Sequence, residues 1–292
     1  AIYKRAYAGI INSDPVLLEE SFLNLEKELG IIDPKLIVLD FDFFPETRLI
    51  SLVAQELEIP TVEIQHGVYS AGKKLVSGRY ADYVFVWGNY FKNLYLKSKI
   101  KQKQEIHILG YPYSINKPKT IQYHKKIVYI GQPMELYGDQ FLNTKIDLIK
   151  ELDTLCRDNR FQFAYKPHRM EDMDLLKKEL SSVKFCPKTE KIEDTIQDND
   201  IFISFNSTAL IEAALNSKIC VQLKFFNVPT DDFEKLEICQ SFTSLSELDH
   251  FLKDLNSTDD LKSFYSQVSS DFIEIPSITP GKKFIELIKD II

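Results

Sequence analysis

Short apolar runs alternate with helix-patterned stretches along most of the chain, and this alternation constrains the fold more than any other feature of the sequence. Most of the runs end in a glycine or in polar turn residues. A strand that is covered on both faces has this apolar character, and strands that alternate with helices form a doubly wound parallel sheet. We therefore predict an α/β fold with strands at residues 35–40, 61–65, 82–87, 105–109, 126–131, 161–166, 201–204 and 218–223.

The predicted strands fall into two groups on either side of a polar, lysine-containing stretch at residues 114–126, which we interpret as a linker. Each group has the pattern of a Rossmann-like unit. We therefore predict two such lobes that face each other across a cleft, residues 1–118 and residues 119–292. Helical spacing of apolar residues predicts helices at residues 15–29, 47–58, 90–99, 139–157, 173–180, 245–255 and 281–292.

The composition, with 44% hydrophobic and 27% charged residues, is that of a soluble globular protein. No apolar run approaches the ~20 residues of a membrane span. The net charge of −7 argues against nucleic-acid binding. The four cysteines are widely spaced, which is typical of buried thiols in a reducing compartment. We expect a cytoplasmic location, with the inner face of the membrane as an alternative. Because the chain starts at Ala1, we also expect a piece of a longer protein, with a truncated first lobe.

The stretch from Phe202 to Ala213 predicts a strand, a tight turn and a helix. Ser207 and Thr208 fall in the turn, where the first backbone N–H groups of the helix would point outward and attract an anion such as phosphate. Ser204 precedes the turn, and Glu212 lies about one helical turn further on, where it could reach a sugar hydroxyl. The alternative is that Ser207 only caps the helix.

Three potential cations, Lys166, His168 and Arg169, follow another predicted strand. A histidine at the rim of the sheet can bind a phosphate or protonate it as it leaves. The alternative is a surface loop with incidental charges. Gly131 and Gln132, in the first loop of the second lobe, form a weaker candidate for nucleotide contact, because they do not complete a GxGxxG pattern.

In the first lobe, His66 follows a predicted strand, and Gly67 allows a sharp turn after it. Lys73, Lys74 and Arg79 could hold an anion behind this histidine. A core histidine bound to a backbone carbonyl is the alternative.

Carboxylates lie among aromatic residues after the preceding predicted strand, and the candidates for a catalytic base in this lobe are Asp42, our first choice, Glu46 and His66. Desolvation there would raise the pKa of Asp42 and favour its use as a catalytic base. The alternative is an aspartate that caps the next helix.

Several of these motifs occur in an order that resembles GT-B glycosyltransferases of bacterial surface polysaccharide synthesis. The motifs are Gln65-His66-Gly67, Val86-Trp87-Gly88, Leu109-Gly110-Tyr111-Pro112, Lys166-Pro167-His168 and Ser204-x2-Ser207-Thr208-x3-Glu212. The resemblance extends from about residue 35 onward and is greatest to capsule and lipopolysaccharide transferases that use CMP-activated acidic sugars of the sialic acid or Kdo type. The CDP-glycerol glycerophosphotransferases of teichoic acid synthesis have a similar order of motifs.

The resemblance implies a metal-independent glycosyltransferase of GT-B fold that takes a nucleotide-sugar donor and a glycan or lipid-linked glycan acceptor, without a cofactor. In bacterial sialyltransferases a His-Pro pair and a Ser-Ser/Thr pair contact the CMP phosphate. Ser207-Thr208 matches the second pair, whereas His168 is followed by Arg169 instead of proline. The base in the first lobe, Asp42 or Glu46, is assigned by position only.

The alternatives are a glycerophosphotransferase, a UDP-sugar epimerase of the same architecture, or a silent domain that binds a glycan or a partner enzyme. Any membrane association is expected through other parts of a larger protein.

Overall fold

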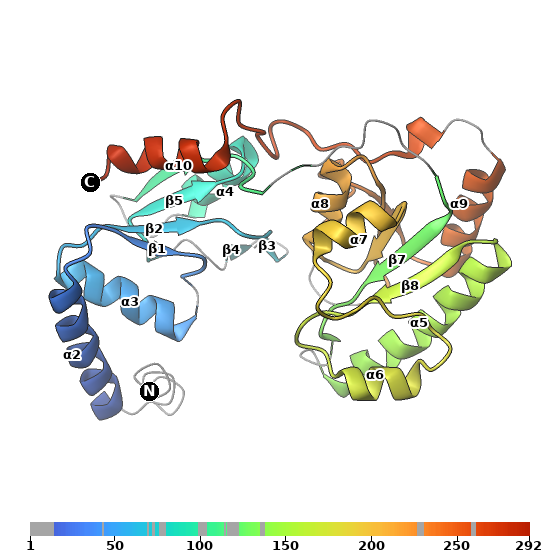
Figure 1. The fold of residues 1–292 in the computed structure, drawn as a ribbon, viewed down its shortest axis with the longest axis horizontal. Helices are drawn as coiled ribbons and strands as arrows, with labels where there is room; N and C mark the ends of the chain where they lie inside the picture. Colours follow the sequence, from blue (N-terminus) through green and yellow to red (C-terminus); the bar gives the residue numbers. More distant parts are fainter. Residues whose placement is uncertain are drawn as a thin grey trace. The chain divides into compact units, whose positions relative to one another are not determined.

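The structure is a computed structural model, and it forms two compact units (Figure 1). Unit 1 comprises residues 1–113 and 270–292, and unit 2 comprises residues 114–269. Each unit is a parallel sheet with helices packed on it, so the predicted α/β fold of two Rossmann-like lobes is confirmed. The structure describes residues 15–42, 44–68, 70–71, 74–75, 80–98, 104–113, 115, 123–134, 138–226, 231–257 and 261–292.

Unit 1 contains a four-stranded parallel sheet in the order β1-β2-β5-β6. Its strands are β1 (Ile37–Leu39), β2 (Thr61–Ile64), β5 (Tyr83–Val86) and β6 (Glu105–Ile108), and a small antiparallel pair consists of β3 (Ser70–Ala71) and β4 (Lys74–Leu75). The helices of this unit are α2 (Pro15–Ile32), α3 (Pro45–Glu56), α4 (Asn89–Ser98) and α10 (Pro280–Lys289).

The helices of unit 1 lie on both sides of its sheet (Figure 1). Helices α2 and α3 pack together through Leu25, Leu49 and Val53. A separate cluster is formed by Val62 and Phe85 of the central strands with Leu109. The apolar side of α10 covers it through Phe284, Leu287 and Ile288, together with Ile291 just after the helix.

The C-terminal segment, residues 270–292, therefore belongs to unit 1, although the sequence analysis assigned it to the second lobe. The segment runs along the carboxyl ends of β5 and β6. Glu274 N donates a hydrogen bond to Trp87 O at 2.8 Å, and Tyr111 N donates one to Glu274 O at 2.8 Å. The amphipathic pattern of α10 predicts a helix that packs on a sheet, but it carries no information on which sheet.

Two glycines of the sequence motifs make this approach of the chain possible. A Cβ atom at Gly88 would lie 2.5 Å from Phe272 O, and one at Gly110 would lie 2.7 Å from Glu274 O. Gly110 also has a φ of +83°, a conformation that other residues adopt at a cost. The Val86-Trp87-Gly88 and Leu109-Gly110-Tyr111 motifs thus have a structural role, because they accommodate the C-terminal segment.

Unit 2 contains a five-stranded parallel sheet in the order β11-β10-β9-β7-β8. The strands are β7 (Lys126–Ile130), β8 (Gln162–Lys166), β9 (Ile201–Ser204), β10 (Ile219–Leu223) and β11 (Gln240–Phe242). The helices are α5 (Asp139–Asp158), α6 (Met173–Glu179), α7 (Ile192–Asp198), α8 (Ala209–Leu215), α9 (Leu245–Ser257) and the 3-10 helix η2 (Leu261–Phe264).

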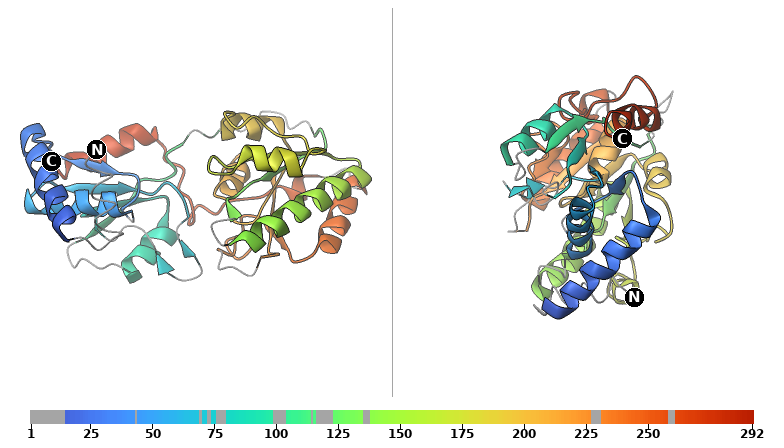
Figure 2. Two further views of the ribbon diagram at one scale, coloured as in Figure 1. Left: turned by 90° about the horizontal axis from the view of Figure 1, so that it is seen from below. Right: turned by 90° about the vertical axis from the view of Figure 1, so that its left-hand side faces the viewer.

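The strands of unit 2, apart from the edge strand β11, are largely buried on both faces. One face packs against α5 and α9 in the main hydrophobic core, which includes Tyr129, Ile203 and Leu152. On the other face Cys220 donates a hydrogen bond from Sγ to Leu210 O of α8. Figure 2 shows α5 and the α7–α8 pair on different sides of this sheet. The sequence analysis did not predict β11, a three-residue edge strand, or α7, because both are short and largely polar.

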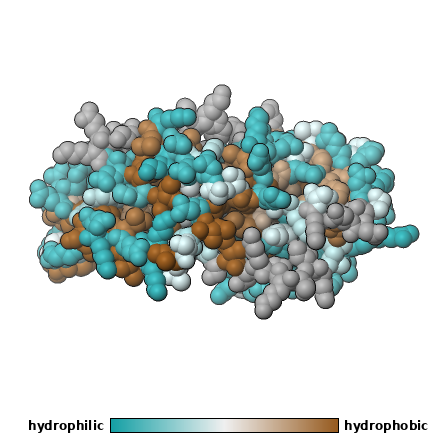
Figure 3. All heavy atoms as spheres, turned by 90° about the horizontal axis from the view of Figure 1, so that it is seen from above, coloured by the Kyte–Doolittle hydropathy of each residue, from teal (hydrophilic) through white to brown (hydrophobic). Residues whose placement is uncertain are grey.

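Large apolar side chains on the surface are interspersed with polar ones (Figure 3). Ile278, just before α10, is 36% exposed, and Ile285, within α10, is 51% exposed. None of the described helices combines the length and the apolar character needed to cross a membrane.

Candidate functional site

Three loops gather at the carboxyl edge of the sheet in unit 2, where open α/β sheets bind their ligands. Residues 131–134 follow β7, residues 167–171 follow β8, and residues 205–208 follow β9. Because β7 lies between β8 and β9 in the sheet, the three loops are neighbours. The structure thus brings together the candidate residues that sequence analysis proposed for the second lobe. We call this region the unit 2 edge.

Gln132 links two of these loops through its side-chain amide. Its Nε2 donates to Asn206 O at 2.5 Å, and its Oε1 accepts from Asn206 N at 2.8 Å. The predicted nucleotide contact at Gln132 is therefore an internal clamp that fixes the turn before Ser207. Gly131 is buried and packs directly against the side chains of Tyr165 and Glu171.

Two predicted ligands are engaged elsewhere in the structure. Lys166 is buried, and its Nζ donates to Pro187 O at 2.8 Å and to Glu190 O at 2.6 Å. Ser204 is fully buried, and its hydroxyl donates to Ile130 O on the neighbouring strand at 2.9 Å. Both side chains point to the protein's own backbone, so we assign them structural roles instead of ligand contacts.

His168 lies half-buried at the rim of the unit 2 edge. Met170 N donates a hydrogen bond to His168 Nδ1 at 3.2 Å. A ring nitrogen that accepts a hydrogen bond carries no proton, so neutral His168 carries its proton on Nε2. This tautomer suits a residue that donates to a phosphate. Arg169, the next residue, is exposed.

Ser207 and Thr208 directly precede the seven-residue helix α8, in the turn that the sequence predicts. Ser207 Oγ accepts a hydrogen bond from Ala209 N, the first residue of α8, at 3.3 Å, while the N-cap position itself is Thr208. Both residues are half-buried and stand beside the clamp between Gln132 and Asn206.

Glu212, in the first turn of α8, is half-buried. Burial raises the pKa of its carboxyl group from 4.5 to about 7, and the nearby carboxylate of Glu193 adds to this shift. The group is therefore partly protonated near neutral pH, and it can then donate as well as accept a hydrogen bond.

This raised pKa predicts a pH dependence of the stability of unit 2. Below pH 4.5 the carboxyl is protonated in both states, and its contribution is lost as the pH rises through the folded-state pKa of about 7. At ~1.4 kcal/mol per pKa unit, the loss over this shift amounts to at most about 3.5 kcal/mol. Unfolding free energies from urea titrations at pH 5 and pH 8, followed by circular dichroism, measure it.

Glu212→Gln should remove this change in unfolding free energy between pH 5 and pH 8, and Glu193→Gln should make the change smaller without removing it. An equal pH dependence of the unfolding free energy in the wild type and in Glu212→Gln would contradict the raised pKa of Glu212.

A buried ion pair that sequence analysis missed lies beneath the unit 2 edge. Lys145 Nζ of α5 is 2.5 Å from Glu171 Oε1, and both side chains are almost completely inaccessible to solvent. Glu171 also accepts from Tyr165 OH at 2.6 Å. Burial, together with the charge of Glu171, raises the pKa of Tyr129.

A sequence signal for this pair existed on α5. Lys145 precedes Ile149 by four residues and Leu152 by seven, so it occupies the apolar stripe of the helix. A lysine at such a position indicates a buried partner charge.

In unit 1, His66 follows β2 at the carboxyl edge and is exposed. Its Nδ1 lies 2.5 Å from Asp40 O, and the ring packs edge-on against Phe41. A carbonyl oxygen only accepts, so Nδ1 carries the proton and Nε2 is the basic nitrogen. The alternative of a carbonyl-bound histidine is thus correct for the contact, although the residue is not in the core. Lys73 and Arg79 lie outside the described residues, and of Lys74 only the backbone is described.

Gln65, the residue before His66, fixes this loop. Its side-chain Nε2 donates to Gly67 O at 3.0 Å, and its side-chain Oε1 accepts from Trp87 N at 2.9 Å. Its backbone carbonyl accepts from Trp87 Nε1 at 2.8 Å. The Gln65-His66-Gly67 motif therefore combines a buried structural glutamine with an exposed histidine.

Asp42, our first choice as the base, is fully buried. Its Oδ2 accepts from Tyr80 N at 2.6 Å and from Ala81 N at 3.1 Å. These contacts anchor the start of β5 and assign Asp42 a structural role. It does not cap α3, whose N-cap is Phe44. Glu46 lies in the first turn of α3 and is half-buried. Phe43 lies outside the described residues.

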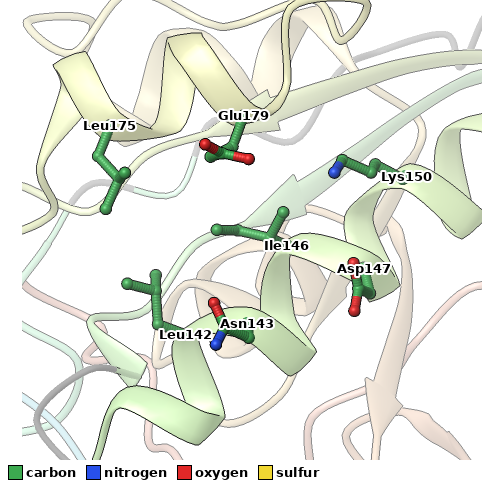
Figure 4. A pocket seen from close by; sticks show the side chains of 7 residues that line it. All are labelled: Leu142, Asn143, Ile146, Asp147, Lys150, Leu175 and Glu179. Atoms are coloured by element: carbon green, nitrogen blue, oxygen red, sulfur yellow. The ribbon is translucent and has the colours of Figure 1, made fainter.

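A pocket of about 300 Å3 lies between α5 and α6, and none of its lining residues belongs to the loops of the unit 2 edge (Figure 4). Five of its lining side chains come from α5 and two from α6. They are Leu142, Asn143, Ile146, Asp147, Lys150, Leu175 and Glu179. None of these residues is among those that sequence analysis proposed as a site.

Comparison with known proteins identifies the fold. No family model and no curated protein matches the sequence. S. aureus MnaA, solved with UDP, superposes with a TM-score of 0.65 and 14% identity, over 94% of this chain and 79% of its own. The UDP-GlcNAc 2-epimerase of Neisseria meningitidis bound to UDP-GlcNAc gives 0.64 and 13%, over 94% and 82%. The Methanocaldococcus jannaschii UDP-GlcNAc 2-epimerase with UDP-GlcNAc and UDP gives 0.63 and 11%, over 92% and 79%.

At these identities the similarity establishes the fold, two Rossmann-like lobes of GT-B type. The nucleotides named for these three structures are UDP and UDP-GlcNAc.

Proposed function

We propose that the chain is a sugar-nucleotide-dependent enzyme whose unit 2 edge binds a pyrimidine nucleotide joined to a sugar. The observation that carries this proposal is the arrangement of the edge. Two internally clamped loops present Ser207 and Thr208 after β9, and His168 and Arg169 after β8, and these are the two strands that flank β7. Solved structures of the same fold contain UDP or UDP-GlcNAc, which supports a nucleotide of this class.

The proposed reaction breaks the bond between the anomeric carbon of the sugar and the nucleotide phosphate. Negative charge then develops on the phosphate oxygen, and donors that are already in place stabilise it. His168 supplies Nε2–H, Arg169 supplies a guanidinium group, and Ser207 and Thr208 supply hydroxyl groups. Glu212 would contact a hydroxyl of the nucleotide's sugar.

In the proposed reaction the sugar is transferred to a hydroxyl group of a glycan or lipid-linked glycan acceptor. An acceptor hydroxyl must lose its proton during transfer, and His66 is our proposed base because its Nδ1–H contact with Asp40 O makes Nε2 the basic nitrogen. Glu46 is the second choice. The donor that the sequence resemblance implies is a CMP-activated acidic sugar, and CDP-glycerol is the alternative.

A UDP-sugar epimerase is the second candidate function, favoured by the similarity to UDP-GlcNAc 2-epimerases. The two functions differ in their products. Epimerisation of UDP-GlcNAc in D2O exchanges the hydrogen on C2 and removes its 1H NMR signal, whereas a transferase needs an acceptor before the donor is consumed.

A thermal-shift panel of CMP, CDP, UDP, UDP-GlcNAc and CDP-glycerol tests the proposed function. A nucleotide that binds should raise the midpoint temperature of thermal unfolding, because a ligand at ~100 times its dissociation constant adds ~2.7 kcal/mol of stability. Ser207→Ala combined with Thr208→Ala should weaken the best ligand about tenfold, which is a loss of about 1.4 kcal/mol, as expected for hydrogen bonds to a charged group.

Ser244→Ala is a matched control, because Ser244 accepts from Glu247 N at the start of α9, on another helix of the same unit. It should leave the affinity unchanged. A chain that none of the five ligands stabilises would refute the proposed function, and an unchanged affinity of the Ser207/Thr208 variant would move the phosphate site elsewhere.

A further inference from the structure

The buried ion pair of Lys145 and Glu171 is the central element of a hydrogen-bond network under the unit 2 edge. Ions taken out of water lose their hydration, and such a pair is tolerated only when further hydrogen bonds satisfy its remaining atoms. Glu171 meets this condition, because Oε1 accepts from Lys145 Nζ and Tyr165 OH, and Oε2 accepts from His168 N at 2.6 Å.

The network reaches all three loops of the edge. Through Glu171 it holds the backbone of His168 in the loop after β8. Lys145 Nζ also donates to Gln132 O at 3.2 Å, in the loop after β7. The side chain of Gln132 in turn clamps Asn206 in the loop after β9. One ion pair thus connects His168 with the turn that precedes Ser207.

The close packing around the pair leaves little space for adjustment. A Cβ atom at Gly131 would collide with the hydroxyl of Tyr165 and would lie 2.5 Å from Glu171 Oε2. The ion pair and its hydrogen bonds therefore have a well-defined geometry.

We propose that Lys145 and Glu171 are positioning residues that hold His168 and the loop of residues 205–208 in the geometry that binds the nucleotide phosphate. This proposal rests on the proposed function. It assigns the accurate placement of the phosphate-binding groups to two residues that do not themselves touch the ligand. Groups that are held in place before the charge develops stabilise it most, because no reorganisation is needed.

The test replaces the pair by side chains of similar length. Lys145→Met with Glu171→Met removes both charges and every hydrogen bond of the pair, and a buried pair replaced by apolar residues often leaves a protein folded. The affinity for the nucleotide that the wild type binds should fall tenfold or more in calorimetry. In 15N NMR, His168 should lose the Nε2–H tautomer pattern; His168→Gln assigns its signal among the five histidines.

A graded variant separates positioning from general disruption. Lys145→Met with Glu171→Gln also removes both charges but keeps an oxygen that accepts from His168 N, so it should retain most of the affinity and the His168 spectrum. The matched control is Arg157→Met with Asp153→Asn, which neutralises a surface ion pair on the same helix. It should behave like the wild type in both measurements.

Wild-type affinity and a wild-type His168 spectrum in the folded double methionine variant would overturn the proposal. If that variant does not fold, Tyr165→Phe replaces it, because it removes one hydrogen bond from Glu171 and keeps both charges. A threefold loss of affinity with a changed His168 spectrum then supports the proposal, and wild-type values overturn it. A wild type that binds no nucleotide refutes the proposed function, whereas the His168 spectra of the variants still decide whether the pair positions this residue.

Discussion

A chain that ends at Ser269 should lose the fold of unit 1 while unit 2 remains folded. The truncation removes Phe272 and Ile273, which are 3% and 2% exposed, together with the apolar side of α10, which covers Phe85 and Leu109. A buried apolar side chain contributes ~1.5–3 kcal/mol, and several of them together approach the 5–15 kcal/mol that typically holds a domain. Unit 1 would therefore lack the apolar contacts that stabilise its sheet.

The only tryptophan of the chain makes this prediction easy to measure. Trp87 lies fully buried in unit 1, so its fluorescence reports this unit alone. In the truncated chain the emission should shift to that of a solvated indole, while hydrogen exchange still protects β7 and β9. A synthetic peptide of residues 270–292 should restore the buried emission. Wild-type Trp87 fluorescence without the peptide would contradict the assignment of this segment to unit 1.

Replacement of His66 by alanine should lower turnover by ~10²-fold or more, the usual contribution of a general base. The contact with Asp40 O keeps the proton on Nδ1 and makes Nε2 the atom that removes the acceptor's proton. Binding of the nucleotide in unit 2 should persist, so calorimetry should give an unchanged dissociation constant. Added imidazole should restore part of the lost rate, since it replaces the missing base.

His107→Ala is the matched control for this variant. His107 lies on β6 of the same unit and pairs with Glu105 at 3.1 Å. Its loss should leave turnover unchanged. If His66→Ala turns over at the wild-type rate, the base is not His66, and Glu46→Gln becomes the next variant to measure.

The strands and the loops that follow them could be predicted from the sequence, because burial on both faces selects apolar runs and every strand end needs a turn. The expected strand at residues 201–204, the turn at Ser207 and the helix after it agree with β9 and α8. The helix predicted to stop at Gly30 instead continues to Ile32. Glycine weakens a helix by only about 1 kcal/mol relative to alanine, so it does not by itself end one.

The roles of individual polar residues were harder to predict, because a sequence does not show which backbone atoms come within reach of a side chain. Lys166 looked like a phosphate ligand, yet its ammonium group holds Pro187 O and Glu190 O, more than twenty residues further along the chain. Asp42 looked like a base beside aromatic rings, yet it binds the backbone of Tyr80 and Ala81. Glu171 resembled any charged loop residue until the fold placed Lys145 beside it.

Unit 1 is built from two segments that are far apart in the chain, and this affects the order in which the two units fold during translation. Translation delivers residues 270–292 only after the whole of unit 2, residues 114–269, has left the ribosome. Nascent domains generally fold from the amino terminus onward, but here the first sheet must wait, with Val62, Phe85 and Leu109 uncovered, until α10 emerges. Unit 2 is complete earlier, so it can mature first. These apolar residues of unit 1 therefore stay exposed to solvent until α10 arrives, and slower elongation through unit 2 would lengthen that exposure.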